Sequence, residues 1–347
     1  METRAKKHVS TLKVCLLKNT LIFLECKINN NMEHLSANHF HCEETCKSDK
    51  PFKKAARTKQ SLFREKYLKV GFDPSNRFGK YGAFLLPEDA DAGLNFYEGF
   101  RSDILNQIRK RYPKLTTAQH AGLYANMLRS EHIPWNVFVP MKADLQAAAK
   151  VFNDILGEPL IDVITDIRIE WAPEKTTCLN DNTSFDAYIE FMHDGQIGGI
   201  GIEVKYTEEG YHFGEKEHDE VMKNEQSQYA KITRNSGLYK EDIANRPIRE
   251  TNLCLDEFRQ IWRNHILGES MVMNNMLERF YSITLYPNGN PHFTKVLPKY
   301  REFLTEYGVS TFKSITFESL FDLLKIYYPR ESKFQDWIKY LQARYPF

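Results

Sequence analysis

The 347-residue sequence predicts a mixed α/β (α+β) fold organised around a central sheet. Two observations carry this prediction. Two alternating strand patterns flank Asp194-Gly195, a dipeptide type that strongly favours a tight hairpin turn. Segments with helical spacing lie before and after this hairpin, and a further strand pattern follows the long helix behind it. In chain order the elements are helix, strand, strand, strand, helix, strand.

Three predicted helices lie in the first half of the chain, each with apolar residues three or four positions apart. The first ends near Tyr112-Pro113, and the second covers about residues 116–129. The third ends at Gly157 and Pro159. Together they predict a helical layer.

The remaining elements are predicted from the same two patterns, which are strand-like alternation and helical spacing of apolar residues. Residues 161–171 alternate between apolar and polar side chains, as in a half-buried strand. One long helix is predicted over about residues 258–276, with its methionines Met271, Met273 and Met276 in the core. A strand follows at about residues 280–286. The tail carries two amphipathic helices, and Thr316 is placed to cap the first.

The hairpin itself places two acids and a lysine on one face. If Asp194-Gly195 forms the turn, the register puts Asp186 opposite Glu203, with Lys205 beside them. The other face is apolar and consists of Phe185, Ala187, Ile189, Phe191, Ile200, Ile202, Val204 and Tyr206. Cβ atoms of opposed residues lie about 4.5 to 5.5 Å apart, so two like charges there are destabilising. A Mg²⁺ ion held by these acids compensates for that repulsion.

Two other readings of this face remain open. Lys205 alone neutralises the acids if the face is simply solvated, as many exposed ion pairs are. Gly198, Gly199 and Gly201 favour a site, because they keep the face open. A bulge at Gly199 or Gly201 is the second alternative, and it shifts the register by one residue.

Composition describes a globular chain without an overall basic field, since its net charge is +1 and 27% of its residues are charged. The basic residues between 50 and 69 are opposed only by Glu65, which is typical of a solvated or disordered arm. The alternative is a segment that contacts phosphates, through Lys53, Lys54 and Arg57. We therefore divide the chain into a poorly ordered extension (1–50, with Met32 as an alternative start), a basic arm with a turn-rich connection (51–97) and a main domain with a C-terminal helical extension (98–347).

The cysteines and the apolar segments predict an intracellular, cytoplasmic protein. Six scattered cysteines do not form a disulfide framework in a chain of this length. The cluster His39, His41, Cys42 and Cys46 lacks the second pair that zinc-finger spacing requires. The apolar stretch at residues 12–28 is interrupted by charges, which disfavours a membrane span. Phosphate-loop, G-x-S-x-G, paired-histidine zinc and dinucleotide motifs are absent from the sequence.

The hairpin motif carries a family resemblance. An aspartate followed by E-x-K on a central hairpin, inside an αβββαβ order, resembles the PD-(D/E)XK nuclease superfamily with its restriction-endonuclease-like fold. The segments SFDAYIEF and IGIEVKYTE, after a strand ending IEWAP, look like a largely uncharacterised bacterial branch of that fold. The likeness covers roughly residues 94–347 and implies a mixed central sheet flanked by extra N- and C-terminal helices. Phe185 stands where the superfamily name has proline.

The resemblance implies roles for individual residues. Asp186, Glu203 and Lys205 match the three signature positions. The expected ligands of one or two Mg²⁺ ions, with Mn²⁺ as the substitute, are Asp186, Glu203, the Val204 carbonyl and Glu170. Glu98 and Glu131 are weaker candidates for the additional acid. On the long helix, Gln260 resembles a glutamine that braces the site in some members. Arg263 is expected to contact nucleic acid, whereas His265 is expected in the core.

The expected activity is metal-dependent endonucleolytic hydrolysis of DNA, with Lys205 orienting or deprotonating the attacking water. Two alternatives stay open because a fold does not determine a function. One is a catalytically silent protein of this fold that binds nucleic acid or acts as a scaffold, and the other is a non-nucleolytic enzyme. DNA is the expected partner, no membrane is expected, and the sequence leaves a homodimer open.

Overall fold

The computed structural model describes residues 41–42, 44–76, 79–210, 214, 218–219, 221 and 223–347. Met32 and most of the predicted N-terminal extension lie outside these residues. The described chain combines one mixed sheet with many helices, so the α/β (α+β) prediction is confirmed. None of its helices is both long enough and apolar enough to cross a lipid bilayer.

The sheet has five strands in the order in which they occur along the chain. The first three, β1 to β3, pair antiparallel, whereas β3–β4 and β4–β5 pair parallel. The predicted order of helix, three strands, helix and strand is therefore present, and a short fifth strand extends it. The strands are β1 (Val163–Trp171), β2 (Phe185–His193), β3 (Gln196–Val204), β4 (Arg279–Tyr286) and β5 (Phe312–Thr316).

The β2–β3 hairpin has the predicted turn and register. Asp194 and Gly195 both have positive φ angles, 48° and 76°, as the tight turn requires. The strands pair without a shift from His193–Gln196 to Ala187–Ile202. The bulge considered at the β3 glycines is thus absent from this pairing, and the register shift occurs instead between β1 and β2, at Ile164/Asp166.

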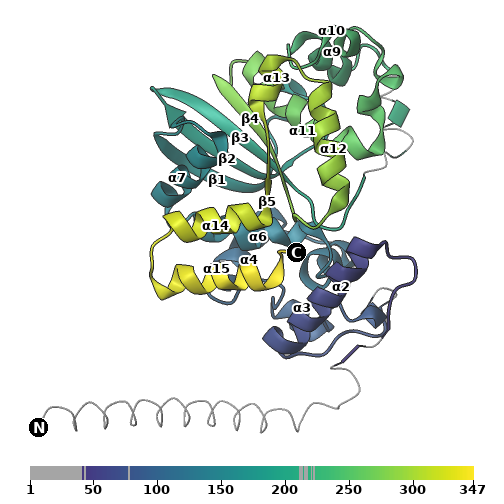
Figure 1. Ribbon diagram of the computed structural model, residues 1–347, viewed down its shortest axis with the longest axis vertical. Coiled ribbons are helices and arrows are strands. Elements are labelled where there is room, and N and C mark those ends of the chain that lie inside the picture. Colours follow the sequence, from purple (N-terminus) through teal and green to yellow (C-terminus); the bar gives the residue numbers. More distant parts are fainter. Residues whose placement is uncertain are drawn as a thin grey trace, which may run out of the picture.

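Helices cover both faces of the sheet (Figure 1). One face packs on α4 (Arg101–Arg111), α6 (Ile133–Met141), α7 (Leu145–Leu156), α14 (Phe317–Tyr327) and α15 (Ser332–Arg344). The opposite face packs on α9 (Gln228–Asn235), α11 (Asp256–Met273) and α12 (Pro291–Glu302). A separate apolar cluster fills each interface, and β2 and β4 contribute side chains to both clusters.

Most predicted helices are present, with one clear error. The predicted ends of α4 and α7 are confirmed, and Gly157 ends α7 in the left-handed conformation. The Thr316 side chain caps α14 by accepting from the Ser319 amide. The helix predicted over residues 116–129 begins as expected, with Thr116 as its cap, but α5 (Thr117–His120) continues as a π-turn (Ala121–Ala125) that ends four residues before Arg129. Helix α6 was missed because all nine of its residues are buried, which leaves no polar face.

The long helix α11 ends at Met273, three residues before its predicted end. Met271 is buried, but Met273 and Met276 are 43% and 37% exposed, so the prediction that all three methionines lie in the core is wrong. His265 is fully buried and lies within hydrogen-bond distance of the hydroxyls of Tyr300 (3.1 Å) and Thr311 (3.0 Å). It is the core histidine that the sequence predicted.

The basic stretch folds as a helix, α2 (Pro51–Phe63), which packs on α15 beside the C-terminus (Figure 1). The Gln60 amide donates to the Tyr206 hydroxyl (2.7 Å) and to the Arg344 carbonyl (3.1 Å). The other short elements are α3 (Pro87–Asp91), α10 (Glu241–Ala244), α13 (Glu306–Thr311), a π-turn (Arg64–Leu68) and 3-10 turns (Gly79–Tyr81, Ser130–His132, Lys175–Thr177, Ile248–Glu250, Asn252–Cys254).

Candidate active site

One polar cavity of about 350 Å³ lies where β1, β2, β3 and α11 meet. It brings together six of the residues that the sequence singled out for chemistry or substrate contact. They are Glu170, Asp186, Glu203, Lys205, Gln260 and Arg263. Strands that are neighbours in the sheet supply the acids and the lysine, and α11 supplies the last two side chains.

The strands fix the two acids and the lysine through their backbones. Asp186 is the second residue of β2, and its Oδ2 accepts a hydrogen bond from the Val204 amide (2.6 Å) on β3. Glu203 lies near the end of β3, and Lys205 follows that strand directly. The Lys205 amide donates to the Leu285 carbonyl of β4 (2.8 Å), so the chain stays paired where the lysine leaves the sheet.

This face is not open, contrary to the sequence interpretation. Glu203 and Lys205 are only 5% and 7% exposed. A Cβ on Gly201 would lie 2.5 Å from the Phe185 ring, and one on Gly199 would lie 2.8 Å from Leu277 and Tyr188, so side chains already fill the space above these glycines. The solvated-face alternative therefore does not describe the site.

Two residues of the hairpin also face a different side of the sheet from the one predicted. Gly198 faces Phe191 in the opposite cluster, so it does not contribute to the acidic face. Phe185 packs in the α11-side cluster with Tyr188, at 5.7 Å between ring centroids, and not with the apolar face of Ala187. The alternation breaks because Phe185 is the first residue of β2 and pairs with Trp171, which stacks on Tyr188 at 4.2 Å. These rings form an aromatic layer next to the acids.

Helix α11 contributes side chains that contact Glu203 and Lys205. Lys205 forms an ion pair with Glu203 and donates a hydrogen bond to the Gln260 side-chain oxygen. The Asn264 amide donates to the other carboxylate oxygen of Glu203. Gln260 and Asn264 are one helical turn apart, so they face the same way. Sequence reasoning missed Asn264, although its spacing of four residues from Gln260 marks it as a neighbour.

Burial and neighbouring charges shift the pKa values of Asp186 and Lys205 in the cavity. Burial raises the pKa of Asp186 well above its ordinary value, and the charges of Glu203 and Glu170 raise it further. Burial alone would lower the pKa of Lys205, but Glu203 and Asp186 outweigh it and raise that pKa. Lys205 is therefore a stably protonated cation in this state, which favours charge stabilisation over proton abstraction.

Glu170 joins the acids from the end of β1. Its φ of 53° is left-handed, a conformation that non-glycine residues rarely adopt outside turns and functional sites. Burial, followed by the charge of Glu131, raises its pKa to about 7. Its carboxylate accepts from the Ser184 hydroxyl (3.3 Å), and its carbonyl accepts from Arg111 (2.6 Å).

Of the two weaker candidates for the additional acid, the structure places one in the cavity and the other outside it. Glu131 lines the same cavity as Glu170, and burial raises its pKa. Glu98 is not among the lining residues, and it accepts a hydrogen bond from the Tyr67 hydroxyl (3.4 Å) instead. Glu208 also lines the cavity, but it accepts from the backbone amides of Ser130, Tyr206 and Thr207.

The residues predicted to contact nucleic acid have mixed surroundings. Arg263 lines the cavity but is 8% exposed, and it donates to Asp181 (3.0 Å) and to Thr183 (3.1 Å). Arg57 on α2 is also 8% exposed and pairs with Asp49 at 2.6 Å. Lys53 is partly buried and Lys54 is exposed on the same helix. Contact of these four residues with nucleic acid stays a prediction.

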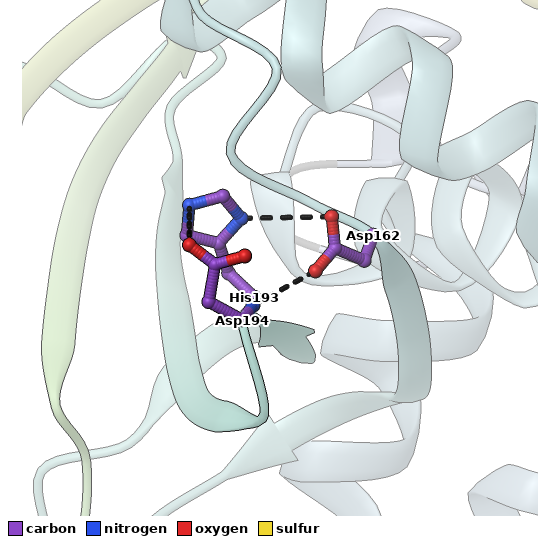
Figure 2. Close-up of side chains that lie close together, drawn as sticks. All are labelled: Asp162, His193 and Asp194. Carbon is purple, nitrogen blue, oxygen red and sulfur yellow. Dashed lines mark hydrogen bonds and ion pairs between the residues drawn. The ribbon is translucent and has the colours of Figure 1, made fainter.

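A second group of ligand-type residues lies at the hairpin turn (Figure 2). Asp162, His193 and Asp194 have ligand atoms within 4.8 Å of one another, the one such group of three or more found in the described part of the chain. The two ring nitrogens of His193 face different carboxylates, Asp162 and Asp194, each at 3.6 Å. This arrangement is that of a histidine bridging two acids in an ion pair. Asp162 also ties down the turn by accepting from the Asp194 amide (2.8 Å).

The cavity acids fit a hard divalent cation better than the turn does. Their donor atoms are oxygens, the type that such a cation prefers, and burial together with the charges of Glu203 and Glu170 raises the pKa of Asp186. The ligand atoms of Glu170, Asp186 and Glu203 do not form a group within 4.8 Å. Glu170, Asp186 and Glu203 would therefore have to move closer together to hold one ion.

The comparisons with known proteins agree with this geometry. A family model described as the PD-(D/E)XK nuclease superfamily matches residues 47–347. The chain belongs to the PD-(D/E)XK nuclease superfamily. No curated protein matches the chain, and no solved structure matches it. The superfamily match includes the basic helix α2, and it confirms the resemblance drawn from the hairpin motif.

Proposed function

We propose that the protein is a metal-dependent endonuclease that hydrolyses phosphodiester bonds of DNA. The observation that carries this proposal is the convergence of Asp186, Glu203 and Lys205 with Glu170 in one polar cavity. Membership of a nuclease superfamily supports the reaction class. The specific substrate and the metal are part of the proposal.

In this proposal Asp186, Glu203, Glu170 and the Val204 carbonyl hold one or two Mg²⁺ ions, for which Mn²⁺ can substitute. The bound cation supplies Lewis acidity toward the scissile phosphate and acidifies water. The Asp186 carboxylate keeps its orientation through the Val204 amide, and Asn264 keeps that of Glu203. Both acids are therefore held before substrate arrives, which reduces the reorganisation needed during the reaction.

Lys205 stabilises negative charge on the phosphate and orients the attacking water. Its raised pKa keeps it protonated, and Gln260 holds its ammonium group. Glu203 shares this ammonium group in an ion pair. These contacts hold the ammonium group of Lys205 beside Glu203, which would be one of the residues that hold the cation.

Cleavage assays with matched variants test the proposal. Purified protein should cut DNA with Mg²⁺ or Mn²⁺ but not with EDTA. Glu203→Ala and Lys205→Ala should each reduce cleavage by about 100- to 10,000-fold while retaining the fold. Substrates should include methylated and unmethylated plasmid, linear duplex and single strands. Undiminished cutting by both variants would exclude this site.

The same assay separates the alternative function. A catalytically silent protein of this fold would bind nucleic acid without cutting any of these substrates in any divalent metal. The buried Lys205–Glu203 pair is the observation that favours this alternative, because it satisfies the acid without a cation. Binding without cleavage across the full panel would therefore support a scaffold or binding role.

A further inference from the structure

We propose that the C-terminal end of α4, with the groove beside it, holds the DNA backbone as it approaches the candidate active site. This inference rests on the proposed function and names the surface that delivers its substrate. It assigns that role to residues 109–114, whose sequence is RKRYPK, and not to the basic helix α2.

The end of α4 carries a concentrated positive charge. Arg109, Lys110, Arg111 and Lys114 are all exposed. Arg109, Lys110 and Lys114 form no ion pair with any carboxylate in the part of the chain that the structure describes. Their charge is therefore available to neutralise phosphates and to release the counterions bound to them.

This cluster lies next to the candidate active site. The Arg111 side chain donates to the backbone carbonyl of Glu170 (2.6 Å), and Glu170 lines the cavity that contains Glu203 and Lys205. The end of α4 is thus directly attached to the rim of the site. DNA held there has a short route to the acids.

A groove of about 670 Å³ runs between α4, α6 and β1, and Lys110 and Arg111 line it. A second hollow of about 340 Å³ shares Trp135 with this groove. That hollow shares Arg129, Glu131 and Glu170 with the active-site cavity. The three hollows therefore lie next to one another around the end of β1, with the buried side chain of Trp135 between the first two. We infer that the path of the DNA backbone runs over them, from the basic cluster to the candidate active site.

Other cations near this path are already neutralised. Lys142 and Arg168 line the groove, but both pair with Asp166, at 3.1 and 3.0 Å. Arg129 pairs with Glu131. Asp103 also lines the groove and contributes a negative charge. The end of α4 consequently supplies most of the uncompensated positive charge along this path.

Helix α2 is less available for the same task. Lys50 pairs with Glu209, Arg57 pairs with Asp49 at 2.6 Å, and Lys59 donates to the Pro346 carbonyl. Arg64 is fully buried and donates to the Gly82 carbonyl (2.9 Å). Four of the eight basic residues between 50 and 69 therefore have partners within the fold itself.

DNA binding by the full chain, measured by fluorescence anisotropy in EDTA across about 50 to 200 mM salt, tests this assignment without any dependence on cleavage. The triple variant Arg109→Gln/Lys110→Gln/Lys114→Gln should bind a labelled DNA about 10- to 100-fold more weakly, and the slope of log affinity against log salt should fall by about 2 to 3. Arg111 is left unchanged because it contacts Glu170.

Three controls make the result specific. Lys295→Gln/Lys299→Gln/Lys325→Gln removes equally exposed charges from α12 and α14 and should leave the slope unchanged. Arg109→Lys/Lys110→Arg/Lys114→Arg keeps the charge and should bind as the wild type does. Because cations also stabilise the last turn of a helix, the Tm of each variant is measured, and the charge-preserving variant separates binding from folding.

The outcomes distinguish this inference from the proposed function. An unchanged slope in the α4 triple variant, or an equal loss in the control triple variant, would overturn the α4 assignment while leaving cleavage by the wild type intact. A reduced slope in Lys53→Gln/Lys54→Gln, with none in the α4 variant, would return the contact to α2. A wild-type protein that neither binds nor cuts DNA would overturn both proposals.

Discussion

The two ends of the β2–β3 hairpin carry similar residues in opposite environments. At the end away from the turn, Asp186 and Glu203 lie with Lys205 in the polar cavity, where Glu203 and Lys205 are almost fully buried and burial raises the pKa of Asp186. At the turn, the side chains of Asp162 and Asp194 are 55% and 84% exposed, and His193 lies between them (Figure 2).

Burial decides which group requires a cation. Exposed acids at the turn are stabilised by water and by the histidine, so nothing further is needed there. Acids in the cavity have lost that solvation and repel one another. The distances between ligand atoms alone would identify the turn as the metal site. We propose the cavity instead, because charged carboxylates are costly to bury without a cation.

Aspartate replacements at the two ends of the hairpin should give the largest difference. Asp186→Ala should reduce metal-dependent DNA cleavage by about 100- to 10,000-fold, because it removes a carboxylate from the proposed metal site. Asp194→Ala is the matched control at the turn and should retain activity within about twofold. Initial cleavage rates on one plasmid substrate measure both. Equal losses at the two ends would refute the distinction between them.

The α11 side chains should have a smaller effect than the acids that they hold. Gln260→Ala and Asn264→Ala should each lower kcat by about 10- to 100-fold with little change in KM, since they orient groups that touch the substrate. Gln260→Glu keeps an acceptor for Lys205 and should recover part of the loss. A rise in KM without a fall in kcat would instead assign these residues to substrate binding.

Metal affinity should weaken as the pH falls below about 7. Burial raises the pKa of Glu170 to about 7, so its carboxyl binds a proton that the cation must displace at lower pH. Apparent Mn²⁺ affinity should fall by about tenfold per pH unit below that value for each displaced proton. Calorimetry in two buffers of different ionisation enthalpy counts the released protons. In Glu170→Gln, the apparent Mn²⁺ affinity should depend less steeply on pH.

The metal-free protein should gain stability from Glu170→Gln. Folding raises the pKa of this carboxyl to about 7, so the folded state holds its proton more tightly than the unfolded chain does. The resulting destabilisation appears as the pH rises above about 4.3 and is complete above about 7. At pH 8 the variant should be about 1 to 3 kcal/mol more stable, and at pH 4 about equal to the wild type. Urea denaturation in EDTA measures both.

The ion pairs at the turn should contribute least. His193→Gln should change the free energy of unfolding by about 0 to 1 kcal/mol, as is usual for exposed pairs, and should leave Mn²⁺ binding intact. Urea denaturation and a metal titration on the same sample measure the two effects. Loss of metal binding in this variant would place the cation at the turn.

The hairpin was predictable because its signals are local. A tight turn fixes the register, and the register alone brings Asp186 to the face of Glu203 and Lys205. Gln260 was also located correctly, on a helix whose apolar period is strong. The family match then confirmed the resemblance that these residues carry.

The errors arose where tertiary packing decides the outcome. The alternation of apolar and polar residues along the strands could not show that α11 covers the acidic face, or that Phe185 and Phe280 fill the space above Gly201. It also gave no signal for α6, which has no polar side. The five-residue strand β5 is too short to show a period. The basic run looked like an arm because sequence does not reveal that Arg57 and Arg64 are buried.

We propose that the buried acids of the hairpin bind a divalent cation. A titration of Mn²⁺, followed by the electron paramagnetic resonance signal of the free ion, tests it directly in the wild type, Glu203→Gln and Asp194→Asn. The wild type and Asp194→Asn should remove Mn²⁺ from solution with the same affinity, and Glu203→Gln should lose that binding. Retention of binding in Glu203→Gln together with its loss in Asp194→Asn would contradict the account.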